Sequence, residues 1–158
     1  LNRALKISPK SRNVLHVLAI INDSMQLWSA SDSLYEKLIS SDSMDVQAYN
    51  NYAYSLVERN ERLDFALQIS TKAITLVPKN AAYLDTYGWI LFKLGKHDEA
   101  LNYIQHSIEL ENTNVIVLEH LGIVLMRVNR KTDALKFYRK AYEFDSSNDT
   151  LKNKAFPE

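Results

Sequence analysis

The sequence has no cysteine and only three glycines and three prolines among its 158 residues. Without thiols the chain forms no disulfide and no thiolate metal site, and cysteine usage gives no indication of a redox compartment. So few helix breakers, together with little strict alternation of polar and apolar residues, favour helices over a sheet. The composition therefore predicts an all-α protein.

Long apolar runs and an excess of one charge are also absent. The longest apolar run, 14–21, is interrupted by His16 and is far shorter than the roughly 20 residues that span a bilayer. Lys+Arg and Asp+Glu each number 19, whereas nucleic-acid binders usually carry a basic excess or stripe. We therefore expect neither membrane insertion nor nucleic-acid binding from a chain whose 46% hydrophobic residues can bury a core.

What the sequence does contain is an internal repeat. Small residues recur at steps of 34, 35 and 34 at Ala19, Ala53, Gly88 and Gly122. A second small series, at Ser31, Ala66, Ala100 and Ala134, has steps of 35, 34 and 34. An apolar series, at Leu5, Ile39, Ile74, Ile108 and Tyr142, has steps of 34, 35, 34 and 34. One extra residue within 58–62 accounts for every 35-residue step, and a turn tolerates such an insertion best.

Residues that favour helix N-caps repeat with the same period, at Ser11, Asp45, Asn80, Asn114 and Asn148. Pro9 and Pro78 stand just before two of them, where they end the preceding helix. Each unit is therefore predicted to be a capped helix, a turn and a second helix. The expected helices are the tail of one at 1–8, pairs at 12–25 and 29–43, 46–58 and 62–77, 81–94 and 97–111, 115–128 and 131–144, and a short one from about 149.

The repeat divides the chain, as a single domain, at regular boundaries. We predict a second-helix remnant at 1–11, four repeats at 12–45, 46–80, 81–114 and 115–148, and a short helix or tail at 149–158. The small residues let the two helices of a pair cross closely. Because no pair buries its apolar face alone, the pairs must stack.

These residues resemble the tetratricopeptide repeat, whose pattern combines large apolar, small and aromatic residues at fixed places. The third unit carries Leu84, Tyr87-Gly88, Leu91, Gly95, Ala100 and Ile104, and the fourth carries Leu118, Leu121-Gly122, Leu125, Ala134, Tyr138 and Ala141. The resemblance covers nearly the whole chain. It implies a right-handed α-solenoid of antiparallel helix pairs, with a concave groove lined by the first helix of each pair, that serves as a protein-interaction scaffold.

The resemblance places groove-facing residues in rows on the first helices. One row is Ile20, Tyr54, Trp89 and Ile123, a second is His16, Asn50, Asp85 and Glu119, and Phe92, Met126 and Asn51 lie beside them. We predict a groove with an apolar floor and a slightly acidic flank that holds a peptide by a few anchors. The candidate binding residues are Tyr54, Trp89, Phe92, Asn50, Asn51, Asp85, Glu119, Met126 and His16.

A second interpretation is that the large residues of these rows only pack against adjacent helices. Both interpretations stay open for Trp89 and Phe92, and packing is favoured for Ile20 and Ile123. Some tetratricopeptide domains bind the C-terminal carboxylate of chaperones through Lys, Asn and Arg. Here only Asn51 matches, while His16, Ala82 and Thr86 stand where cations would be needed, so this subtype is disfavoured.

Catalytic and metal-binding patterns are not recognisable. The four histidines, His16, His97, His106 and His120, form no pair on one helix face and are interpreted as exposed or turn residues. Neither a Gly-rich phosphate loop nor a Ser-centred elbow occurs. We therefore expect no enzyme activity, no cofactor and no metal.

Two other functions stay open. The chain starts at Leu1 without Met, inside a predicted helix, and carries no signal peptide, so we interpret it as a piece of a longer protein. It could then be a structural segment of a longer repeat array that self-associates through its terminal repeats or positions other domains, or the docking domain of a larger enzyme. The Tyr-Gly-Trp and His-Leu-Gly strings favour a bacterial source, and the compartment stays unknown.

Overall fold

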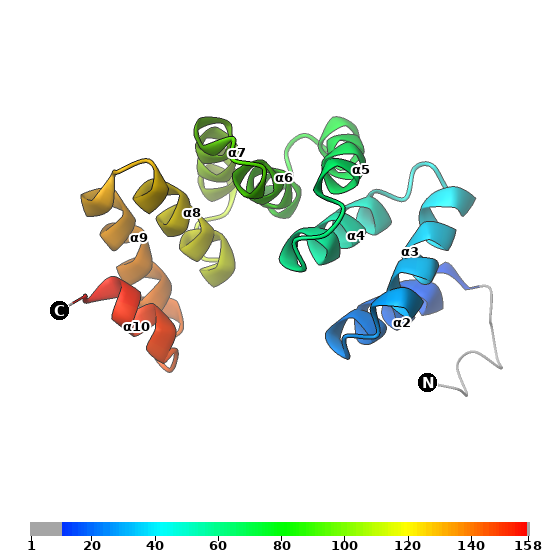
Figure 1. Cartoon of the computed structure of the whole chain (residues 1–158), viewed down its shortest axis with the longest axis horizontal. Helices are drawn as coiled ribbons and strands as arrows, with labels where there is room; N and C mark the ends of the chain where they lie inside the picture. Colours follow the sequence, from blue (N-terminus) through cyan, green and yellow to red (C-terminus); the bar gives the residue numbers. More distant parts are fainter. Residues whose placement is uncertain (1–10, 158) are drawn as a thin grey trace. The chain divides into compact units, whose positions relative to one another are not determined.

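The computed structural model describes residues 11–157, and within that range it contains helices and turns but no strand (Figure 1). The helices are α2 (Arg12–Ser24), α3 (Trp28–Ser41), α4 (Val46–Glu58), α5 (Leu63–Leu76), α6 (Ala81–Lys93), α7 (His97–Leu110), α8 (Val115–Arg127), α9 (Lys131–Phe144) and α10 (Asp149–Ala155). All agree with the predicted ranges to within two residues. The helix tail predicted at 1–8 lies outside the described residues.

Side-chain caps begin four of the five helices for which a cap was predicted. Asp45 accepts a hydrogen bond from the Ala48 N–H, and Asn80, Asn114 and Asn148 do the same at the starts of α6, α8 and α10. Each such cap contributes about 1 kcal/mol. The prediction is wrong for Ser11, whose side chain makes no cap bond, although its carbonyl still accepts from the Leu15 N–H at 3.1 Å.

The turn inside each helix pair contains a residue in the left-handed region at an equivalent position. These residues are Gln26, Asn60, Gly95 and Asn129, with φ of 59°, 56°, 81° and 62°. In three of the four pairs the small residue of the second helix lies five positions after the left-handed residue, as Ala100 does after Gly95. In the second pair the separation is six positions, from Asn60 to Ala66. The inserted residue therefore lies after Asn60, and a second left-handed residue, Arg62 with φ 46°, accommodates it.

Small residues lie at the crossings of the helix pairs, as predicted. A Cβ on Gly88 would stand 2.7 Å from Ile104 Cγ1, and one on Gly122 would overlap the Tyr138 ring. Ala19, Ala53 and Ala66 have no exposed surface. Since the first and second helices of a pair touch at these points, the side chains around them form the core.

The described residues divide into two compact units, 11–76 (unit 1) and 77–157 (unit 2). The core of unit 1 includes Tyr35, Leu38, Tyr52 and Leu56, all fully buried. The core of unit 2 is mainly aliphatic and ends in a cluster of Leu118, Ala141 and Leu151, which α10 closes. No helix among residues 11–157 combines the length and hydropathy that crossing a bilayer requires.

Candidate functional site

In unit 1 the predicted groove residues come from α2 and α4. His16 and Asn50 are buried, and Asn51 and Tyr54 are half-buried. His16 Nε2 lies 2.9 Å from Asp45 Oδ2, which also accepts from Arg12 Nε at 2.9 Å. The carboxylate that caps α4 thus also connects α4 to α2.

The environment of Asp45 determines its charge. Burial raises the pKa of the Asp45 carboxyl, but hydrogen bonds from Arg12, the Ala48 N–H and His16 outweigh that effect and lower the pKa below its ordinary value. An ionised carboxylate only accepts hydrogen bonds, so His16 Nε2 must be the donor in this pair.

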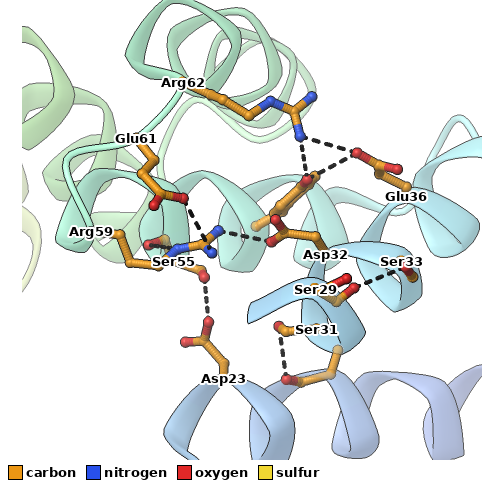
Figure 2. A network of polar contacts seen from close by, with 12 residues as sticks. Asp23, Ser29, Ser31, Asp32, Ser33, Glu36, Ser55, Arg59, Glu61 and Arg62 are labelled. Atoms are coloured by element: carbon orange, nitrogen blue, oxygen red, sulfur yellow. Dashed lines mark hydrogen bonds and ion pairs between the residues drawn. The ribbon is translucent and has the colours of Figure 1, made fainter. Parts of the chain in front are cut away.

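A second polar network in unit 1 surrounds Arg59, whose side chain is only 7% exposed. Figure 2 shows its guanidinium beside Asp32, to which Nη2 donates at 2.8 Å. Nε donates to the Ser55 carbonyl at 3.2 Å, and the group lies 4.9 Å over the Trp28 ring. Ser55 in turn donates to Asp23 of α2. The buried Arg59 cation therefore ties α4 to α3, and the Ser55 hydroxyl ties α4 to α2.

Arg62, the residue that accommodates the insertion, extends this network along α3. Its Nη1 donates to the Tyr52 hydroxyl at 2.8 Å and to Glu36 at 3.1 Å, and its guanidinium lies 4.4 Å over the Phe65 ring. Burial raises the pKa of the Tyr52 phenol well above its ordinary value. Sequence reasoning missed both arginines, although the 35-residue step pointed to their turn.

In unit 2 the structure brings together three predicted residues of α6 with one unpredicted residue of α8. Asp85 is buried and accepts from His120 Nδ1 at 3.0 Å. The Trp89 ring stacks on the His120 ring, with centroids 4.0 Å apart, and on the Phe92 ring at 4.9 Å. Trp89 is only 6% exposed, so its main contacts are within the fold.

The interpretation of the histidines as exposed or turn residues is wrong for two of them. His16 and His120 are buried and paired with carboxylates 29 and 35 residues away. Because each partner belongs to a different helix or its cap, spacing along one helix gives no sign of the pair. Within residues 11–157 no group of three or more His, Cys, Asp or Glu side chains is placed to hold a metal ion.

The other predicted residues of α8 lie nearer the surface. Glu119 accepts from Lys154 Nζ of α10 at 2.5 Å, and Met126 is 40% exposed. On α2, Val17 and Ile20 are 54% and 45% exposed. Apolar surface therefore remains on the predicted binding face of first helices in both units.

We name two surfaces by the residues that share a face of neighbouring first helices. The α2–α4 face comprises His16, Val17, Ile20, Asp23, Asn50, Asn51, Tyr54 and Glu58. The α6–α8 face comprises Asp85, Trp89, Phe92, Glu119, His120, Ile123 and Met126.

Comparison with known proteins agrees with this architecture. Among curated proteins, the chain is 25% identical over 109 residues to a TPR repeat-containing protein of Pseudomonas aeruginosa, covering 69% of this chain and 18% of that protein. It is 27% identical over 110 residues to the type IV pilus assembly protein PilF of the same organism, covering 68% and 43%. The chain thus spans less than half the length of either relative.

Solved structures share the fold at low sequence identity. A thermophilic TPR protein of Thermus thermophilus superposes with a TM-score of 0.83 at 22% identity, covering 98% of this chain and 84% of that one. PilW, a type IV pilus biogenesis factor, gives 0.80 at 20% identity, covering 92% and 67%. YrrB, described as a TPR protein with an unusual peptide-binding site, gives 0.70 at 20%, covering 98% and 79%.

A family model described as the tetratricopeptide repeat matches residues 4–156. This match covers almost the whole chain, including every described helix, and the fold it implies is the observed one. The chain therefore belongs to the tetratricopeptide repeat family.

Proposed function

We propose that this chain is a scaffold that binds a peptide or a partner protein through the α2–α4 face and the α6–α8 face. The main support for this proposal is the apolar surface that stays exposed on these two faces, at Ile20 and Met126, between polar side chains. Such side chains anchor a partner by burying area that the isolated chain exposes to water.

The residues of the α6–α8 face have different parts in this proposal. Phe92 and Met126 are the anchors, because each keeps surface that a partner can cover. Trp89 is a positioning residue: stacked between histidine and phenylalanine rings, it holds Phe92 in place. The Asp85–His120 pair supplies a fixed polar edge.

Two relatives support a binding role. One solved neighbour is described by its peptide-binding site, and one curated relative takes part in pilus assembly. We accordingly propose that the chain assists the assembly of other proteins rather than catalysing a reaction.

The test is quantitative capture of partners from an extract of the source cells. Ile20→Glu and Met126→Glu place a charge on the proposed faces and should each reduce the captured partner about tenfold or more, since a buried unpaired charge is costly. Leu110→Glu, at an exposed apolar position of similar size at the end of a second helix, is the matched control and should capture normally. Equal capture by all three variants would refute the proposal.

A further inference from the structure

Two buried acceptor atoms on the α2–α4 face have no hydrogen-bond partner among the described residues. They are His16 Nδ1 and Asn50 Oδ1, on residues that are only 6% and 7% exposed. Native proteins leave few such atoms unsatisfied, because each costs about 1–3 kcal/mol. Both belong to the row that the sequence predicted to face a ligand, so the pair requires an explanation.

The chemistry of both atoms is that of an acceptor. His16 donates through Nε2 to Asp45, and in the neutral form of the ring Nδ1 carries the lone pair that accepts. Asn50 Oδ1 carries two lone pairs, and the broad terminal torsion of asparagine lets the carboxamide turn toward a donor. Asn50 follows Asp45 by five residues, about 7–8 Å along the helix, so the two acceptors lie at the same end of the face.

The charges of α2 and α4 favour a cationic donor. Arg12 is the single Lys or Arg on these two helices, and it is bound to Asp42 and Asp45. The face itself carries the carboxylates Asp23 and Glu58. Arg12 shares Asp45 with His16, and the Arg59 cation that follows α4 is bonded to Asp32. Carboxylates therefore outnumber cations around this face, and such a surface attracts positive groups and repels acidic segments.

Apolar surface lies beside the acceptors. Val17 and Ile20, one turn apart on α2, are 54% and 45% exposed. A ligand that satisfied only the acceptors would leave this surface in water, so the complementary ligand combines a cation with an apolar side chain.

We propose that the α2–α4 face binds a basic amphipathic segment of a partner protein. A lysine or arginine of that segment donates to Asn50 Oδ1 and His16 Nδ1, while an apolar neighbour covers Val17 and Ile20. This inference rests on the proposed scaffold function and adds the chemical class of the partner.

The experiment measures fluorescence anisotropy with three short labelled peptides of alternating Leu and Lys, Leu and Glu, or Ser and Lys. The Leu-Lys peptide should bind, more weakly at high salt, and more tightly than either other peptide. Asn50→Leu keeps roughly the volume of the side chain but removes the acceptor. This variant and Ile20→Ser should each weaken binding of the Leu-Lys peptide about tenfold. Ile116→Ser in unit 2, at an isoleucine of similar exposure, should leave the affinity unchanged.

Asn50→Asp keeps an acceptor and adds charge, so it should tighten Leu-Lys binding severalfold even if Asn50→Leu fails to fold. Equal or tighter binding of the Leu-Glu peptide, or unchanged affinity in the Asn50 variants, would overturn the basic-segment proposal. If the Leu-Glu peptide bound and its affinity fell in Ile20→Ser, the scaffold function would stand but the basic-segment proposal would not. If none of the three peptides bound, both the scaffold function and the basic-segment proposal would be overturned for this face. Water would then be the partner of the two acceptors.

Discussion

At the scale of single residues, Asp45 combines three roles in one carboxylate. It caps α4 through the Ala48 N–H, receives the His16 ring and binds the Arg12 guanidinium. Its side chain has no exposed surface, so every one of its lone pairs depends on protein donors. A residue predicted from its cap position alone therefore also holds two helices together.

Asp45→Ala should lower the free energy of unfolding by roughly 2–4 kcal/mol, because it removes a cap and leaves a buried imidazole unpaired. Because the folded pKa of Asp45 is lowered, its contribution is present above the unfolded pKa and disappears as pH falls through the folded value. Urea unfolding between neutral and acidic pH should show this loss in the native chain and a flatter profile in Asp45→Ala. Parallel profiles would contradict the assignment.

Trp89→Ala should destabilise the chain by about 3–5 kcal/mol, because the buried indole fills space between two rings. Trp89→Phe keeps an aromatic ring in the stack and should recover more than half of the loss. Thermal unfolding measures both. A loss below about 1 kcal/mol in Trp89→Ala would mean that the indole is a surface residue, available to a partner.

At the scale of helices and turns, the repeated left-handed residue determines where each pair reverses direction. Gly95 has φ of 81° and nothing within 4 Å of the place where a Cβ would stand, whereas Gln26 adopts φ of 59° with a side chain attached. The four turns are thus similar in backbone but differ in how well their residue suits that backbone.

Substitutions at these two turns should have opposite effects. Gly95→Ala should destabilise by about 1–2 kcal/mol through backbone strain alone, since nothing lies within contact distance of the new Cβ. Gln26→Gly should stabilise by up to about 1 kcal/mol by relieving the same strain. Chemical unfolding of the two variants gives both values, and effects of the same sign would show that contacts rather than φ dominate.

At the scale of the whole molecule, repeats of this kind contact mainly their neighbours, so stability is expected to be distributed along the chain. The chain divides into its two compact units between residues 76 and 77, close to the repeat boundary predicted at 80. The inserted residue of the second repeat and its arginines lie entirely in unit 1.

Local destabilisation should therefore stay local. In Asp45→Ala, amide hydrogen exchange should accelerate more for residues 12–76 than for residues 77–157, because the lost contacts all lie in unit 1. Trp89→Ala should give the reverse pattern and serves as the matched variant. Uniform acceleration in both variants would indicate that the chain unfolds as one cooperative body.

The sequence by itself determined the described helices, four of their five predicted caps, the small residues at each crossing and the turn that holds the insertion. These follow from interactions within a few residues or from the repeat period, which brings equivalent positions into equivalent surroundings. Only the tertiary structure decided that Trp89 is buried, that His16 and His120 pair with carboxylates, and that Arg59 lies in a buried network. Those partners come from different helices, and the distance between two side chains on neighbouring repeats is set by packing rather than by spacing along the chain.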